Sequence, residues 1–553
     1  MIVKAGGDIM EIIQLSSLDK IFLDSEITKI DYKSATALKG EKFSYQICYR
    51  MPEADWRMYN VDINVESEIK EYITVYSVGQ VPSCLPVNND RERVDGNYIT
   101  DKPGLFPDVL YPLERNGFIY KKNWSTIWIE IKLPKDIIPK EYKITVSFNT
   151  EDKTEKTEFT LEVINAVLPE QKLKFTQWFH CDCLKTYYGV KEFDDEHFRI
   201  IKNFVKMAAD NGMNMILTPV ITPTLDVDEG GERPTVQLVK IYKDKDKYTF
   251  DFSDLEKFIK ISLECGIKYF EIAHLFTQWG AKYAPKVMGY ENGVYKKLFG
   301  WETSAASKEY SNFLRQFVPA LTAFFDKKNM KDKVYFHISD EPKEEDLDTY
   351  KVAKELLFPL LDGYKCMDAL SDYEYYEKGL VNIPVVANNH IDSFFDKNIP
   401  ELWTYYCSSQ DTDVSNRFFS MPSYRNRIIG IQMFKYNIKG FLHWGYNFYY
   451  SARTRCEIDP FTVTDAMGIF PSGDSFSVYP GKAGVPYPSL RLIVFNEALQ
   501  DLRALEALKD KIGYEKTVEI IEEGLLEKID FKTYPHNSEY ILNLREKINR
   551  MLV

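Results

Sequence analysis

Cysteine is scarce in this sequence: its 553 residues include only 8, and their spacing does not repeat. Cys181 and Cys183 are separated by one residue rather than the two that are typical of a zinc knuckle, and no second pair accompanies them. The pattern argues against a disulfide framework and a structural zinc site, and it predicts reduced thiols.

Long apolar runs are also missing, and none is long enough to span a membrane. The first residues, MIVKAGGDIMEIIQLSS, have a short apolar start and early acidic residues, which is not the pattern of a signal peptide. We therefore expect no membrane insertion and, if the N-terminus is complete, a cytoplasmic protein. The sequence leaves the oligomeric state open.

Basic residues are in deficit, and the formal net charge is −13. Because phosphate binding needs a basic surface, this charge argues against a nucleic-acid partner. The sequence also lacks HExxH or another local metal-ligand spacing. A catalytic zinc would need distant residues such as His180, Asp182, His274 and His390 to converge in the fold. We expect no metal and no cofactor.

Aromatic residues are abundant, with 37 Tyr, 35 Phe and 8 Trp. Their rings can fill cores or stack on the apolar faces of sugars.

The pattern of apolar residues predicts a multidomain α/β protein. Residues 1–168 are expected to form an antiparallel β-sandwich, because short runs rich in β-branched and aromatic residues alternate with polar turns. These runs lie at 43–50, 71–81, 126–134, 142–148 and 158–165.

Residues 169–460 are expected to form a catalytic (β/α)₈ barrel, because eight short apolar strands mostly alternate with helical stretches. The strands are expected at 173–182, 214–220, 268–276, 334–342, 365–371, 384–390, 401–407 and 438–447. Helices are predicted at 196–212, 252–266 and 308–328. Residues 461–553 are expected to contribute an extended segment and helices that pack on the barrel.

Polar and aromatic side chains collect at the ends of these strands, where barrel enzymes carry their active sites. Imidazole and amide groups can hydrogen-bond to hydroxyls, and Trp faces pack against sugar C–H groups. The mixture predicts a carbohydrate pocket, although a rim without a ligand is the alternative. The candidate substrate-binding residues are His180, Asp182, His274, Gln278, Trp279, His337, Asn389, His390, Trp403, Tyr405, His443, Trp444, Tyr446 and Asn447.

Asp340 and Glu341 are adjacent acids at the end of a predicted strand, in the stretch YFHISDEP. Adjacent carboxylates cannot easily lie on opposite sides of a sugar, as glycosidases usually require. The pair suits a mechanism in which the acetamido group of a 2-acetamido sugar is the nucleophile, with Asp340 orienting it and Glu341 as general acid/base. Pro342 predicts an extended Glu341.

Several longer motifs make the chain resemble glycoside hydrolase family 123, the retaining exo-β-N-acetylgalactosaminidases, and related bacterial proteins that share its C-terminal region. They are WFHCDC (178–183), HLFTQWGA (274–281), FHISDEP (336–342), VSNRF (414–418), MPSYRNRIIG (421–430), GFLHWGYNFY (440–449), GDSFSVYPG (473–481) and LQDLRAL (499–505). The resemblance implies the same roles for Asp340 and Glu341. It also implies a terminal β-linked GalNAc substrate, in glycans or glycolipid oligosaccharides, which the residues alone do not.

Two alternatives remain. A conventional glycosidase would pair Glu341 with a distant carboxylate such as Asp182 or Glu271. A non-catalytic carbohydrate-binding protein could use the same scaffold.

Overall fold

The computed structural model describes residues 10–29, 31–51, 59–88, 95–113, 116–119, 122–151 and 153–553. The chain divides into two compact units. We call them the sandwich unit, formed by Met1–Gln171, Ser415–Lys435 and Tyr487–Val553, and the barrel unit, formed by Lys172–Val414 and Tyr436–Pro486. Segments of the two units alternate along the chain. The division into three consecutive domains, 1–168, 169–460 and 461–553, stays a prediction.

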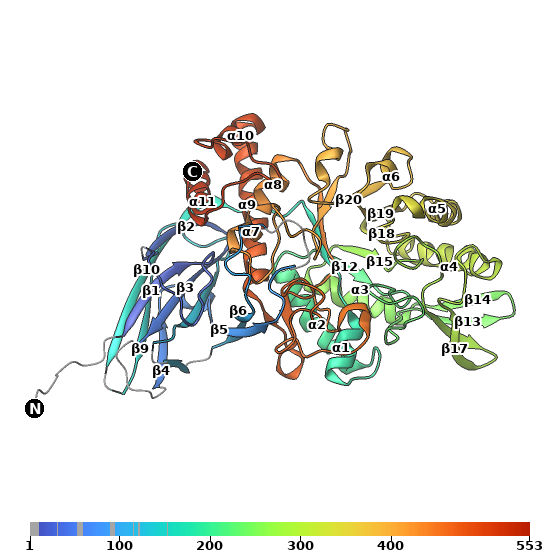
Figure 1. Cartoon of the computed structure of the whole chain (residues 1–553), viewed down its shortest axis with the longest axis horizontal. Helices are drawn as coiled ribbons and strands as arrows, with labels where there is room; N and C mark the ends of the chain where they lie inside the picture. The colour runs from blue at the N-terminus through green and yellow to red at the C-terminus, as the bar shows by residue number, and fades with distance from the viewer. Residues whose placement is uncertain are drawn as a thin grey trace, which may run out of the picture. The chain divides into compact units, whose positions relative to one another are not determined.

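Eight parallel strands close into a barrel within the barrel unit (Figure 1). All eight lie within or next to the segments that the sequence predicts, and the multidomain α/β fold class is confirmed. In barrel order they are β11 (Lys174–Gln177), β12 (Met215–Thr218), β15 (Tyr269–Ile272), β18 (Val334–Phe336), β19 (Lys365–Leu370), β20 (Ile383–Ala387), β21 (Trp403–Tyr405) and β22 (Gly440–His443).

Helices α2 and α4 of the barrel unit begin at polar caps and bury an apolar face. Asp194 caps α2 by accepting a hydrogen bond from the backbone N–H of His197, and Ser307 caps α4 in the same way. The α-helices are α1 (Cys181–Tyr188), α2 (Asp195–Asp210), α3 (Ser253–Cys265), α4 (Lys308–Asp326), α5 (Leu347–Leu361) and α6 (Tyr373–Glu377).

A small sheet with strand order β14-β13-β16-β17 forms from two insertions in the barrel unit. Its strands are β13 (Lys240–Asp244), β14 (Lys247–Asp251), β16 (Val287–Glu291) and β17 (Val294–Phe299). The sequence analysis did not predict this sheet, because its strands are only five or six residues long and each carries charged residues, as polar loops do.

Inside the barrel, the indole ring of Trp403 packs against Gly440. Trp403, the first residue of β21, is fully buried. A Cβ atom on Gly440 of β22 would lie 2.0 Å from the Trp403 ring. Only glycine leaves room for the indole at this position, so Trp403 serves the barrel core.

The sandwich unit contains two five-stranded sheets with orders β1-β3-β8-β5-β6 and β2-β10-β9-β4-β7. Alternate apolar side chains from both sheets form its core. One strand pair differs from the antiparallel expectation, because β2 runs parallel to β10. The strands are β1 (Glu11–Ser16), β2 (Ser34–Lys39), β3 (Lys42–Arg50), β4 (Tyr59–Glu66), β5 (Ile73–Ser83), β6 (Gly104–Pro112), β7 (Asn116–Ile119), β8 (Ser125–Lys132), β9 (Glu141–Asn149) and β10 (Thr154–Val167).

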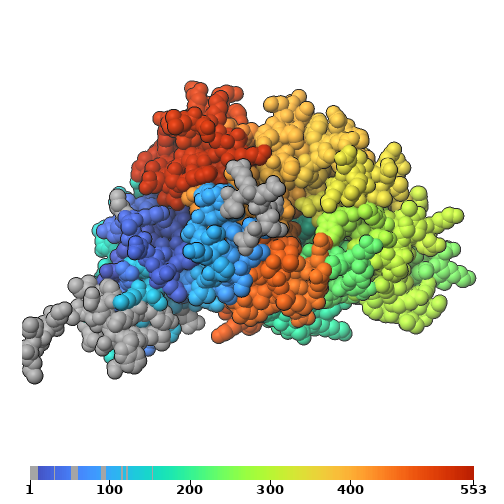
Figure 2. All heavy atoms as spheres, viewed as in Figure 1, coloured from blue at the N-terminus to red at the C-terminus, as the bar shows by residue number. Residues whose placement is uncertain are grey.

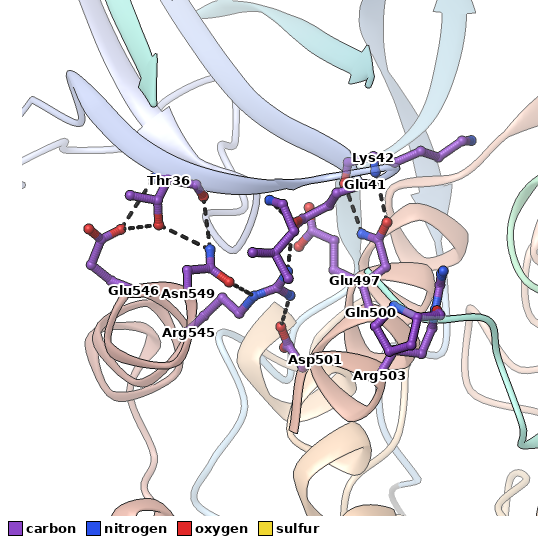
Figure 3. Close-up of polar contacts among 12 residues, drawn as sticks. Thr36, Glu41, Lys42, Glu497, Gln500, Asp501, Arg503, Arg545, Glu546 and Asn549 are labelled. Atoms are coloured by element: carbon purple, nitrogen blue, oxygen red, sulfur yellow. Dashed lines mark hydrogen bonds and ion pairs between the residues drawn. The ribbon is translucent and has the colours of Figure 1, made fainter. Parts of the chain in front are cut away.

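Five α-helices belong to the sandwich unit, and buried ion pairs connect some of them to its strands (Figure 3). Arg545 donates to Glu41 beside β3 at 2.6 Å and to Asp501 at 2.8 Å. In Figure 1 the red C-terminal helices lie above the blue strands of this unit, and Figure 2 shows the atoms of the red C-terminal segment above those of the blue N-terminal segment. The helices are α7 (Ser423–Arg427), α8 (Ile429–Lys435), α9 (Leu490–Ile512), α10 (Tyr514–Ile521) and α11 (Ser538–Met551).

No helix in the described part of the chain is long and apolar enough to cross a membrane.

Candidate active site

A cavity of about 560 Å³ opens in the barrel unit, beyond the carboxyl ends of several barrel strands. Six of the predicted site residues line it: Gln278, Trp279, Asp340, Glu341, Tyr405 and Trp444. Residues that the sequence analysis did not propose for the site also contribute, and they include Trp178, Asp226, Cys407, Arg453, Arg455, Met467, Ile469 and Phe470.

The backbone of the acidic pair is held by two neighbouring segments. The N–H of Glu341 donates to the carbonyl of Ala369 on β19 at 3.2 Å, and the carbonyl of Asp340 accepts from the N–H of Trp279 at 3.0 Å. Glu341 has a φ of +40°, so the predicted extended conformation is wrong. These contacts outweigh the local preference imposed by Pro342, and such strain is common at functional sites.

The surroundings of the two carboxyl groups raise the pKa of both. Burial raises the pKa of Asp340 well above its usual range, and the neighbouring Glu341 raises it further. Burial also raises the pKa of Glu341, although a hydrogen bond from the Tyr405 hydroxyl opposes the shift. Ionisation of both carboxyl groups is therefore disfavoured, which favours a pair that keeps one proton.

A buried charge network lies beneath this pair. His337 contacts Glu271 through Nε2 at 2.6 Å and Asp368 through Nδ1 at 3.0 Å. Burial opposes a charge on His337, but the hydrogen bonds to Asp368 and Glu271 outweigh it and raise its pKa to about 10. Trp178 donates to Glu271 at 2.6 Å, which connects the network to the cavity wall. His337 thus acts below the cavity rather than on its surface.

His180 and Asp182 face a buried arginine instead of the cavity. Arg233 donates to both oxygens of Asp182, at 2.8 and 2.9 Å, and contacts His180 Nδ1 at 3.0 Å. Burial and the charge of Arg233 lower the pKa of His180 to about 3, so this imidazole is neutral. Asn447 accepts from the His180 N–H at 2.9 Å and therefore braces the same turn.

The other predicted residues lie outside the described cavity wall. His274 is buried and stacks on His337 with ring centroids 4.3 Å apart. His443 is buried 3.5 Å from Asp474, and Tyr446 donates to the Phe204 carbonyl at 2.9 Å. These side chains and Trp403 help to build the barrel.

Asn389 and His390 lie on a turn after β20. Asn389 accepts a hydrogen bond from Gln410 at 3.2 Å, and His390 is exposed. Neither lines the described cavity wall.

The four residues considered for zinc do not form a ligand set. His180 and Asp182 are bonded to Arg233, and His390 is exposed. Among the described residues, His274, His337 and Asp368 come within metal-binding distance of one another. Both His337 nitrogens are already bonded to carboxylates, which favours a charged imidazolium over a ligand.

Several of the residues missed by sequence reasoning come from loops after β12 and β22 that meet at the cavity. Asp226 follows β12, Arg453 follows β22, and Met467 follows further along the chain. Asp226 accepts from the backbone N–H of Arg453 at 2.8 Å, and its own N–H donates to Gln278 at 2.6 Å. The stretch SARTRC offered one signal, since it places two arginines just after the last barrel strand.

Comparison with known proteins identifies the class that this barrel and its acidic pair define, the glycoside hydrolases. Residues 178–508, more than half of the chain, match the catalytic domain of glycoside hydrolase 123. The chain belongs to glycoside hydrolase family 123, as the sequence motifs predicted.

A solved structure of a family member shows the same fold. A family 123 glycoside hydrolase from Clostridium perfringens, studied for glycolipid glycan hydrolysis, is 16% identical with a TM-score of 0.74 and covers 98% of this chain and 97% of its own. A Parabacteroides merdae β-glucuronidase, at 12% identity, has a TM-score of only 0.30 and covers 82% of this chain and 50% of its own. A search of curated proteins gives no match.

Proposed function

We propose that this glycoside hydrolase is a retaining exo-β-N-acetylgalactosaminidase that uses the acetamido group of its substrate as the nucleophile. The observation that carries the proposal is the position of Asp340 and Glu341: they are adjacent in the chain and both line one cavity. The preference for GalNAc rests on the family, and a glycolipid glycan as substrate is suggested by the relative from C. perfringens.

In this mechanism the two carboxyl groups divide the work. Asp340 accepts the acetamido N–H, orients the acetamido oxygen toward the anomeric carbon and stabilises the oxazolinium ion. Glu341 protonates the leaving oxygen and then takes a proton from the attacking water. Because the pair shares one proton, an N–H donor on Asp340 favours ionisation there and leaves the proton on Glu341.

The conventional alternatives have little structural support. Asp182 is paired with Arg233, and Glu271 is held by Trp178 and His337, so neither lines the described cavity wall. Asp226 is a third carboxylate on that wall, and one of its oxygens accepts the Arg453 backbone N–H. Asp226 is therefore the candidate nucleophile if the reaction proceeds through a glycosyl ester.

Hydrolysis of matched aryl β-glycosides of GalNAc, GlcNAc, Gal and Glc tests the substrate class. We expect turnover of the 2-acetamido sugars, with GalNAc preferred, and very little turnover of Gal and Glc, which lack the nucleophile. Equal turnover of Gal and GalNAc would contradict the mechanism, and no turnover of any glycoside would favour a carbohydrate-binding protein.

A GalNAc-derived thiazoline tests the intermediate itself. It mimics the oxazolinium ion and should bind far more tightly than GalNAc, because the site is complementary to the transition state. Asp340→Asn should weaken thiazoline binding much more than GalNAc binding. A fluorosugar that traps ester intermediates should leave the protein unlabelled in intact-mass measurements, whereas an adduct on Asp226 would establish the conventional mechanism.

A further inference from the structure

Arg453 is a cavity-lining cation whose guanidinium has no protein hydrogen bond or ion pair among the described residues. Its backbone N–H donates to Asp226, and the guanidinium lies over the Trp279 ring, 4.0 Å from the ring centroid. A guanidinium carries five N–H donors and no acceptor, so these donors remain available to a ligand.

The backbone around Arg453 is built into an uncommon shape. Arg453 and Thr454 have φ values of +61° and +52°, a region that non-glycine residues seldom occupy. Asp226 stabilises it by accepting the Arg453 N–H at 2.8 Å and the Thr454 hydroxyl at 2.6 Å. Strain of this kind persists where surrounding contacts hold a residue in a required place.

The neighbouring Arg455 gives a contrast within the same loop. Arg455 also lines the cavity, but it donates to both oxygens of Asp228, at 2.7 and 3.3 Å. Arg455 is thus hydrogen-bonded to a carboxylate of the protein, whereas the Arg453 guanidinium acts on Asp226 and Asp228 only through its charge, with no hydrogen bond to either among the described residues. Trp279, which carries the Arg453 guanidinium, also donates its backbone N–H to the carbonyl of Asp340. Arg453 and the proposed catalytic pair therefore contact the same tryptophan and line the same cavity.

We propose that Arg453 binds an anionic group of the substrate, a carboxylate or a sulfate, so that this enzyme acts on acidic glycans. Arginine matches both groups by paired N–H···O hydrogen bonds. The wall also carries Asp226, Asp340 and Glu341, which would repel an anion unless a fixed cation lay beside it. The inference rests on the proposed function and names the substrate class of the same site.

The anion can have two sources, and matched substrates separate them. A sulfate can be carried by the terminal GalNAc, tested with aryl β-GalNAc and its 6-sulfated form. A carboxylate can be carried by the next sugar, tested with GalNAc β-linked to a uronic acid and to the corresponding neutral hexose. The quantity compared is the ratio of kcat/KM for the anionic to the neutral member of each pair.

We expect this ratio to exceed one for the wild type in at least one pair, and Arg453→Gln to lower it about 10- to 100-fold, as loss of a charge-assisted hydrogen bond predicts. The preference should also weaken as salt is added. Arg455→Gln, the matched control, should change the ratio less than about threefold, because Asp228 already neutralises Arg455. Melting curves of both variants check that they fold.

Neutral members preferred in both pairs, or a ratio that Arg453→Gln leaves unchanged, would overturn the proposal. An equal fall of this ratio in Arg455→Gln would also overturn it, because the preference would then depend on the total positive charge near the cavity and not on Arg453. Equilibrium binding of the same four ligands to Glu341→Gln gives the ratios without turnover. Failure of the wild type to cleave any GalNAc glycoside refutes the proposed function, whereas cleavage without an anionic preference refutes only this inference.

Discussion

Single residues decide the proton transfer in this site, and Glu341 carries the largest expected effect. In the proposed mechanism Glu341→Gln removes the proton donor for the leaving oxygen, and general acid catalysis is typically worth about 10²–10⁴-fold. We expect a loss of that size on GalNAc glycosides with a sugar leaving group. Aryl glycosides with good leaving groups should lose much less at the first step, which single-turnover kinetics will show. An equal loss on both kinds of substrate would contradict the acid role.

Tyr405 tunes the same proton. Its hydroxyl donates to Glu341 and so opposes the rise in the pKa of that carboxyl caused by burial. Tyr405→Phe removes a hydrogen bond to a charged group, worth about 1.5–3 kcal/mol, and should therefore raise the pKa of Glu341 further. Because Glu341 must be protonated to act, the alkaline limb of the kcat/KM profile should move to higher pH. A profile that stays in place, or moves to lower pH, would show that Tyr405 does not act on this proton.

Among the helices, α9 carries a carboxyl group whose titration should be visible in stability. Glu497 contacts Arg427 at 2.8 Å within the sandwich unit. Burial raises its pKa to about 7, although Arg427 opposes the shift. The native state therefore binds more protons than the unfolded chain between about pH 4.3 and 7, where an unfolded Glu is already ionised.

The expected consequence is a free energy of unfolding that falls as pH rises through this range. Each pKa unit corresponds to about 1.4 kcal/mol. Glu497→Gln cannot titrate, so it should flatten this slope, whatever it does to the absolute stability. Urea unfolding of both proteins at pH 5 and pH 7 measures the difference. Identical slopes would mean that Glu497 keeps an ordinary pKa.

At the scale of the whole chain, the sandwich unit is built from segments that are far apart in sequence. Glu41 near the N-terminus, Arg427 in the middle and Arg545 near the C-terminus belong to one buried network in the sandwich unit. A chain that ends at residue 486 keeps Glu41 and Arg427 but loses Arg545, Glu497 and Asp501. Removing one partner of a buried pair typically costs about 3–5 kcal/mol.

We therefore expect the truncated protein to have an unfolded sandwich unit, detected as rapid proteolysis within residues 10–171. Arg550→Gln is the control, because Arg550 also lies on α11 but pairs with Glu162 and Glu546 at the surface. That variant should resist protease as the wild type does. A truncated chain with an intact, protease-resistant sandwich would mean that residues 1–168 fold alone.

Local patterns in the sequence were enough for the barrel and the acidic pair. Each of the eight strands is a short apolar run, and the alternation of such runs with amphipathic helices indicates a barrel without any knowledge of distant contacts. Asp340 and Glu341 are joined by a peptide bond, so their proximity is covalent and a sequence pattern can reveal it.

Only the tertiary structure decided which polar side chains reach the cavity. A histidine at a strand end can face the cavity or pack beneath it, and the choice depends on partners from other strands. Arg233 holds His180, and Glu271 with Asp368 holds His337, in both cases below the cavity wall. Arg453 and Asp226 come from loops without periodicity, and they meet because barrel closure brings β12 and β22 to either side of β11. Such meetings depend on contacts across hundreds of residues, which local sequence patterns do not encode.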